Sequence, residues 1–272
     1  MFPIGAADIF PCVRALIMAM PLWAIAALLF VFFSAASLGA RHVVRRRSDA
    51  QACEEASEQA KSLLTGMTAT FAFFVGFAIN VTWGAVTAAQ VAVEQQAAAL
   101  HQMAWEISNI TDRAESAALM DKLKIYAVAA AHDDGDHLAK GDAANLPSAG
   151  PFDGFEKALH AYVSGPKAQA WQVSALVSGA SGLTSTSAGV AAVANRFVPR
   201  PLAILVMIVG VLASIVMGLT TVVDRRATLI YVWCVIPALS LTVVLALAYP
   251  FALRSGANLA PLRVVAEQIA AQ

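Results

Sequence analysis

The chain has 272 residues, of which 59% are hydrophobic and only 13% are charged. An ordinary soluble domain carries about 25% charged residues, so this composition excludes a soluble protein and indicates an integral membrane protein. Eighteen basic and eighteen acidic residues give a formal net charge of zero, which argues against nucleic acid as a partner.

The first predicted membrane span covers residues 15–40, because no Asp, Glu, Lys or Arg lies between Arg14 and Arg41. A cleaved signal peptide is the alternative, since the sequence SAASLGA imitates a small-residue cleavage site. However, the apolar run is longer than the 7–15 residues typical of such a peptide, and basic residues follow it instead of preceding it. The pattern therefore favours a span.

We predict a linker over residues 41–62, which is first basic and then acidic. The basic part holds Arg41, His42 and Arg45 to Arg47, and the acidic, helix-prone part reads DAQACEEASEQAK. Directly after a span, a basic cluster is typical of a topology signal or a contact with lipid headgroups. A patch for a ligand or for nucleic acid is the alternative interpretation.

The second predicted span, residues 63–93, belongs to a run of 32 residues without a charged side chain between Lys61 and Glu94. About 20 apolar residues suffice for a helix to cross a bilayer. Small and polar residues recur along it at helical spacing and share one face. They are Gly76, Asn80, Gly84 and Thr87, followed by Val91.

This polar face requires a neighbouring helix or a cavity, because Asn80 in the middle of a span is costly against acyl chains. A second, bulky stripe consists of Phe73, Phe77 and Val81 at four-residue intervals. Ordinary helix packing, with Phe toward lipid, and a pore lining with a hydrophobic constriction are both consistent with these two stripes.

Residues 94–199 form a predicted helical insert outside the membrane. The helical pattern of the second span continues through Tyr126 without Gly or Pro, so we expect this helix to project from the membrane and to break near His132. Glu94 would then lie at the mouth of whatever the second span lines. It is either part of a charged ring or a solvated interfacial carboxylate.

Later in the insert, residues 132–142 (HDDGDHLAKGD) predict a solvated loop, because they lack the order of a calcium-binding EF-hand. A short helix is predicted for residues 155–163. The uncharged stretch 168–195 is rich in Ser and Gly, and we expect a helix there that packs on the extension of the second span. A weakly apolar fifth span is the alternative.

Two more spans are predicted, at residues 201–223 and 227–253, followed by a tail over 254–272. The short link between them makes them a tight hairpin, and Pro237 lies within the last one. Four spans place both termini and the insert on one side of the membrane. The two hairpin links carry seven basic residues against five near the membrane on the other side, which by a small margin predicts cytoplasmic links and an outer insert.

The sequence offers no signature of an enzyme. It contains no H-E-x-x-H, G-x-S-x-G or phosphate-binding G-x-x-x-x-G-K-[ST] motif, and the predicted spans contain no His. The His residues of the insert do not have the spacing of metal ligands, and the three cysteines lie far apart. We therefore predict no enzymatic activity, no cofactor and no metal site.

Several motifs resemble the DUF4239 family of bestrophin-like proteins. They are the Gly and Phe residues of the second span leading to Glu94, then Tyr126, then Arg196 followed by Pro199, and finally the segment from Tyr249 to Leu262, YPFALRSGANLAPL. The last segment is similar to the Asp-x-Pro-Phe-x-Gly-x-x-x-x-x-Pro ending of the family. The family's Asp has no clear counterpart here, and the gap from Phe to Gly is longer.

This resemblance implies a homo-oligomer, a pentamer in bestrophins, that conducts inorganic ions, with anions weakly favoured, through a pore lined by the second span. Phe73, Phe77 and Val81 would then form the narrow neck, with Phe74 as the alternative out of phase. It also implies a multi-pass protein of the cell membrane whose insert is cytoplasmic, opposite to the charge count. The acidic calcium clasp of animal bestrophins has no counterpart in RSGANLAPLRVV.

Two other functions are compatible with the same layout. One is a non-catalytic scaffold or accessory subunit that uses the small-residue face and the insert as docking surfaces. The other is a proton-driven stator-type subunit, which the sequence disfavours because no Asp or Glu lies inside a predicted span.

Overall fold

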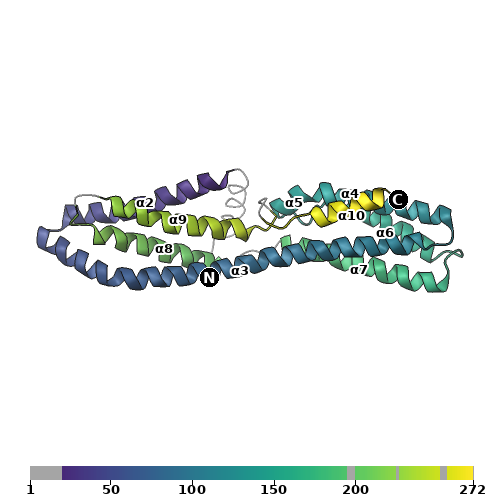
Figure 1. Ribbon diagram of the computed structural model, residues 1–272, viewed down its shortest axis with the longest axis horizontal. Coiled ribbons are helices and arrows are strands. Elements are labelled where there is room, and N and C mark those ends of the chain that lie inside the picture. The colour runs from purple at the N-terminus through teal and green to yellow at the C-terminus, as the bar shows by residue number, and fades with distance from the viewer. Residues whose placement is uncertain (1–19, 195–199, 225–226, 252–255, 272) are drawn as a thin grey trace, which may run out of the picture. The chain divides into compact units, whose positions relative to one another are not determined.

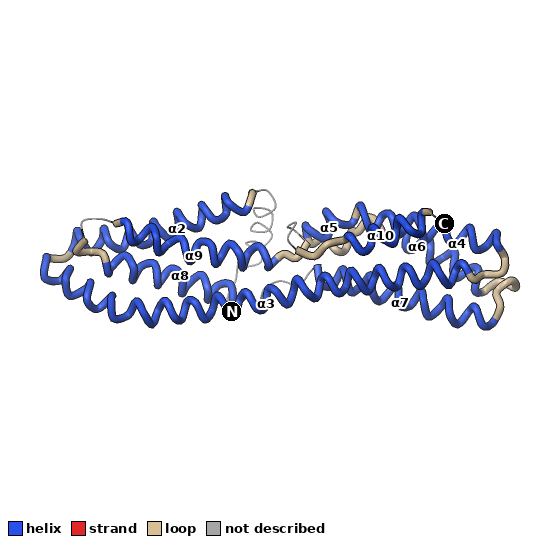
Figure 2. Tube along the Cα trace, in the orientation of Figure 1, coloured by secondary structure: helices blue, strands red, loops and turns tan. Residues whose placement is uncertain are grey.

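The structure is a computed structural model that describes residues 20–194, 200–224, 227–251 and 256–271. Every regular element in these ranges is a helix, in agreement with the predicted all-α class (Figures 1 and 2). The contacts divide the chain into two compact units, and the helix α3 contributes to both. Unit 1 comprises residues 1–84 and 197–248, and unit 2 comprises residues 85–196 and 249–272. Some residues with predicted roles lie outside the described ranges: Arg14, Arg196, Pro199, Arg225, Arg226 and Arg254.

Unit 1 is built from α2 (Leu22–Arg47), α8 (Arg200–Thr220), α9 (Thr228–Ala248) and the first part of α3 (Ala50–Ser108). In Figure 1, α8 and α9 run beside α2, and the contacts between these helices agree with that view.

Small residues let the helices of unit 1 approach closely. Gly210 of α8 leaves room for the rings of Phe33 and Phe71, and Ser37 of α2 donates a hydrogen bond to the backbone oxygen of Ser214. Such close backbone approach is how helices associate in hydrocarbon, where no hydrophobic force draws them together.

The predicted linker over residues 41–62 is almost entirely helical, because α2 continues through Arg47 and α3 begins at Ala50. Arg41 is buried, and both Arg41 and Arg45 donate to the backbone oxygen of Asp224, just beyond α8. Arg45 also donates to the oxygen of Val222, at 2.7 Å. The end of a helix leaves carbonyl groups without partners, and cations suit it. These two arginines therefore hold α2 to the end of α8. The topology signal or headgroup contact predicted for the basic cluster stays a prediction.

The helix α3 ends at Ser108, well before Tyr126, so the predicted continuous extension is wrong. The reason lies in short polar side chains. Ser108 and Asn109 both donate to the backbone oxygen of Trp105, and Asp112 accepts from the backbone N–H groups of the next helix, α4 (Arg113–His132). Side chains that satisfy the end of one helix and the start of the next favour a break even without Gly or Pro.

Unit 2 contains the second part of α3 and five further helices, α4 to α7 and α10. Their bounds are α5 (Asp134–Lys140), α6 (Ala149–Val163), α7 (Ala170–Ala194) and α10 (Ala260–Ala270). The helix α4 contacts α5, α6 and α10. Its Tyr126 is fully buried, with its ring centroid 4.8 Å from that of Phe152.

Three local predictions for this unit need correction. The solvated loop predicted at residues 132–142 is largely the helix α5, whose Asp134 is buried. The helix predicted at residues 155–163 begins earlier, at Ala149, because Pro151 fits the first turn of a helix, where an N–H has no partner to lose. The tail helix begins at Ala260, slightly before the predicted Leu262.

The helix α7 packs on the extension of α3, as predicted. Its Gly179 lies directly against the side chains of Glu106 and Met103 of α3. Among the described residues, five helices are long and apolar enough to cross a membrane, and α7 is one of them beside α2, α3, α8 and α9. The four-span layout and its domain boundaries, with α7 inside the insert, stay predictions.

Candidate functional site: the open face of α3

In unit 1, α3 packs through one side only. Phe71, Val75, Ala78 and Thr82 are buried, and they recur at the three- and four-residue intervals that place them on one side of a helix. Because the chain's own helices cover this side, the opposite side of α3 remains free for another molecule, lipid or water.

We call the opposite side the open face. Its members are exposed and follow one another at alternating steps of four and three residues, with Gly76 beside them. In unit 1 they are Phe73, Phe77, Asn80 and Gly84, and in unit 2 they are Thr87, Val91, Glu94, Ala98, His101 and Trp105.

The structure merges the two stripes that the sequence analysis separated. Phe73 is 68% exposed and Phe77 is 52% exposed, and they share the open face with Asn80. A Cβ atom added at Gly76 or Gly84 would meet no atom within 4 Å. These glycines therefore do not serve packing against the described part of the chain.

Val81 and Phe74 are half-buried and lie off the open face. Four-residue steps turn by about 40° more than a full circle, so a third residue at this spacing drifts toward the buried side. Of the three predicted neck residues, the structure brings Phe73 and Phe77 together with the polar stripe and turns Val81 away from it.

In unit 2 the open face continues beyond the residues that the sequence analysis selected. Ala98, His101 and Trp105 are exposed, whereas Leu100, Met103 and Ala104 on the other side belong to the core of the unit. The alternation of four- and three-residue steps from Phe73 onward was the signal that could have found them.

Glu94 carries a negative charge on the open face and has a fixed hydrogen-bond partner. The amide nitrogen of Gln90 donates to its Oε1, at 3.0 Å. The amide oxygen of Gln90 accepts from the backbone N–H of Asn258, at 2.9 Å. The sequence predicted Glu94 as a site residue but missed Gln90 and Asn258, which are far apart in the chain.

The open face can offer weak polar contacts and a single carboxylate, but no strong ligand set. The Asn80 amide is exposed and makes no side-chain hydrogen bond to the described part of the chain, so its donors and acceptor are available to another group. Within the described ranges, no group of three His, Cys, Asp or Glu side chains lies close enough to hold a metal ion.

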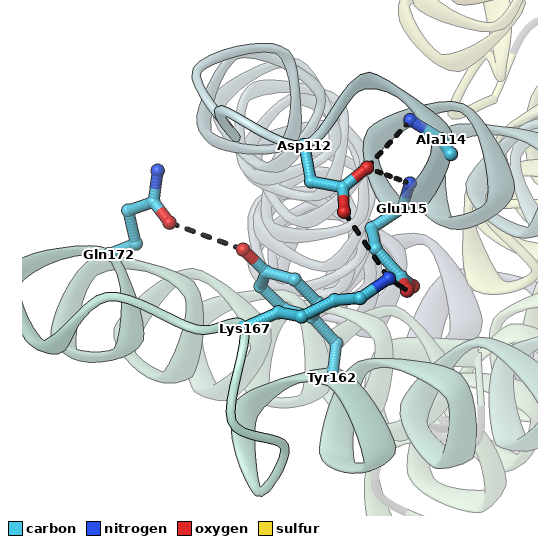
Figure 3. Close-up of polar contacts among 6 residues, drawn as sticks. All are labelled: Asp112, Ala114, Glu115, Tyr162, Lys167 and Gln172. Atoms are coloured by element: carbon cyan, nitrogen blue, oxygen red, sulfur yellow. Dashed lines mark hydrogen bonds and ion pairs between the residues drawn. The ribbon is translucent and has the colours of Figure 1, made fainter.

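A second polar cluster, in unit 2, joins the connection between α6 and α7 to the start of α4 (Figure 3). Lys167 lies 3.3 Å from the Asp112 carboxylate and 2.8 Å from that of Glu115. The Glu115 backbone N–H and Lys167 lower the pKa of Asp112, and the two carboxylates raise the pKa of Lys167. Because these groups neutralise one another at an exposed position, we assign them a structural role.

Unit 2 also buries polar side chains in its core. Gln96 of α3 donates to the hydroxyl of Tyr126, at 2.9 Å, and burial raises the pKa of Tyr126 to about 12. Asp134 accepts from both the N–H and the hydroxyl of Ser148, yet burial outweighs these bonds and raises its pKa. Buried polar groups whose hydrogen bonds are made within the protein fix the packing of a core, and we assign these side chains no role in binding.

Comparison with solved structures shows the same fold in a bacterial bestrophin homologue from Klebsiella pneumoniae. Its crystal structure matches with a TM-score of 0.62 at 13% identity, over 89% of this chain and 95% of that chain. A variant of the homologue matches with a TM-score of 0.65 at 13% identity, over 90% and 97%. A crystal structure of a membrane protein variant matches with a TM-score of 0.65 at 12% identity, over 89% and 96%.

A search of curated proteins gave no match. The family comparison is more direct, because the bestrophin-like domain matches residues 31–253, which is well over half of the chain. That range includes the whole of α3 with its open face, the whole of α7, α8 and α9, and α2 from Val31 onward. By this match the multi-pass, all-α chain belongs to the bestrophin-like family.

Proposed function

We propose that this protein is a subunit of a homo-oligomeric, bestrophin-like ion channel of the cell membrane, with α3 lining an axial pore. The observation that supports this most is the open face of α3. An apolar span packs through its other side and leaves Gly76, Asn80 and Gly84 uncovered, together with two large aromatic rings.

Lipid is a poor neighbour for this face. A side-chain amide transferred to hydrocarbon without a partner costs roughly 2 kcal/mol or more, and Asn80 has no partner in the described part of its own chain. Water in a pore, or the same face of a second copy, would satisfy it. One copy of α3 cannot enclose a pore, so a closed ring of identical subunits is required, and the family resemblance favours five.

Phe73 and Phe77 would form the neck of this pore. Bulky apolar rings one helical turn apart make a constriction that gates by excluding water, and polar and small residues beyond it leave a wider, wetted path. Val81 contributes less than the sequence predicted, because it is turned toward the buried side. No catalytic step and no cofactor is part of the proposal.

A non-conducting scaffold or accessory subunit is the second candidate, because a different membrane protein could also cover the open face. The two candidates differ in what this face touches. A pore exposes it to water and ions, whereas docking seals it against a partner helix.

The first test is the mass of the solubilised complex by native mass spectrometry, followed by cysteine accessibility. Asn80→Cys and Thr87→Cys, in a background without the natural cysteines, should react with a polar thiol reagent. A matched control is Val232→Cys, on the exposed outer side of α9, which should remain inert. A closed ring with reactive cysteines supports the channel. A monomer, or a fixed complex with another protein and inert cysteines, contradicts it.

A further inference from the structure

We infer that the pore selects cations, and that Glu94 is the residue that makes this choice, held in place by Gln90 and Asn258. This inference rests on the proposed channel and adds the class of permeant ion. It differs from the anion preference that the family resemblance implies.

The charges on α3 point to Glu94. From Ser62 to Ser108 this helix carries only two ionisable acids or bases other than His, namely Glu94 and Glu106. Glu106 is 9% exposed and lies between α3 and α7, against Gly179. Glu94 is exposed and occupies a position of the open face. The first turns of α3, before the charge-free run of the predicted span, carry three exposed acids and one exposed base: Glu54, Glu55, Glu58 and Lys61.

The Glu94 carboxylate is positioned by a relay of two hydrogen bonds. The backbone N–H of Asn258 fixes the oxygen of the Gln90 amide, and this leaves the amide nitrogen to donate to Glu94 Oε1. Asn258 is itself fixed, because its side-chain oxygen accepts from the N–H of Ala260 at the start of α10, at 2.9 Å. The relay orients Gln90 in one sense only, with its donor toward the carboxylate.

One oxygen of Glu94 is thereby occupied, and the other is left for an ion or its hydration water. Within the described residues, no Lys, Arg or His forms an ion pair with this carboxylate. In a ring of identical subunits the same carboxylate would recur around the axis. Rings of carboxylates raise the local concentration of cations and oppose the entry of anions, which is how many cation channels select.

The inference is tested by reversal potentials of the purified protein in planar bilayers under a potassium chloride gradient. We expect the wild-type protein to prefer K⁺ over Cl⁻ by on the order of tenfold. Glu94→Gln keeps the shape and the bond from Gln90 but removes the charge, and it should bring the permeability ratio close to one. Glu94→Lys should invert the preference. Glu267→Gln removes an exposed carboxylate of α10 in the same unit and should leave the ratio unchanged.

Gln90→Leu tests the relay separately, because it removes the donor and retains the charge. We expect a smaller loss of selectivity than in Glu94→Gln, with the assembled ring retained by native mass spectrometry. A wild-type channel that prefers Cl⁻, or a ratio that Glu94→Gln does not change, overturns this inference while the channel stands. An assembled protein without any conductance overturns the proposed function itself.

Discussion

Gly218 of α8 lies so close to Ser37 of α2 that a Cβ atom at position 218 would overlap the backbone carbonyl of Ser37. The obstacle is backbone and not the end of a flexible side chain, so it cannot move aside without shifting a helix. The hydroxyl of the same serine donates to the oxygen of Ser214 on α8. This pair of helices is therefore fixed both by a hydrogen bond and by the absence of a side chain.

The first prediction concerns this contact. Gly218→Ala should destabilise the solubilised protein by about 1–3 kcal/mol, the usual cost of overpacking. Loss of tryptophan fluorescence on heating measures the effect. Gly39→Ala, on α2, is the control, because a Cβ atom at this position meets nothing within 4 Å. It should be neutral or slightly stabilising, since Ala favours a helix by up to about 1 kcal/mol over Gly. Equal effects of the two variants would contradict the predicted contact.

The second prediction concerns Gly179 and Glu106, where α7 meets α3. A Cβ atom at position 179 would overlap the Glu106 carboxylate, so Gly179→Ala should destabilise unit 2. Shortening the obstacle with Glu106→Ala should relieve this clash. We expect a double-mutant cycle to give a coupling of about 0.5–3 kcal/mol. Simple additivity of the two changes would show that the residues do not touch.

The third prediction is a pH dependence from Asp134. Burial raises the pKa of this carboxyl above its ordinary value of 3.8, so the folded state binds the proton more tightly than the unfolded state. Its contribution to stability is therefore greatest below pH 3.8 and is lost as the pH rises through the raised pKa. Asp134→Asn cannot ionise and should abolish this loss.

Unfolding in a denaturant, measured at a series of pH values, tests the contribution of Asp134. The difference in stability between Asp134→Asn and the wild type should grow in favour of the variant as the pH rises from about 4. Asp136→Asn, at an exposed position of the same helix α5, is the control and should show no such trend. A constant difference between Asp134→Asn and the wild type would show that ionisation of Asp134 does not change the stability of the protein.

The fourth prediction concerns the buried pair of Gln96 and Tyr126. Tyr126→Phe removes the acceptor and leaves the Gln96 amide nitrogen buried without it. A buried polar group that loses its partner costs about 1–3 kcal/mol. Tyr231→Phe changes a partly exposed tyrosine of α9 and should have little effect. If replacing Gln96 by Leu in the Tyr126→Phe background failed to restore stability, the loss would have another cause.

The long apolar helices were predictable, because uncharged runs of sufficient length leave little choice of structure. The predicted spans at residues 201–223 and 227–253 lie close to α8 and α9. The end of α3 was missed, because the periodicity of apolar residues continues past Ser108. Short polar side chains that cap both helices decided the break, and their effect depends on a chain reversal that periodicity alone does not reveal.

The open face was partly predictable, for a similar reason. Four polar or small residues of the second span were selected correctly as one side of a helix, because spacing along a helix is a local property. The relay from Asn258 to Gln90 was not, since it joins residues 168 positions apart. The half-buried position of Val81 was missed as well, because the side of α3 that packs depends on contacts with other helices, such as that of Phe71 with Gly210 of α8.

The alternating spacing of the open face makes the length of α3 a constraint in its own right. Inserting or deleting one residue between Phe77 and Glu94 would turn every later side chain by about 100° around the helix axis. Glu94 would then leave the side that holds Phe73, while hydrophobicity and charge would stay nearly the same. An insertion or deletion of seven residues would turn the later side chains by only about 20°. Natural relatives should therefore tolerate substitutions in this helix far better than single-residue gaps, and gaps should come in heptads.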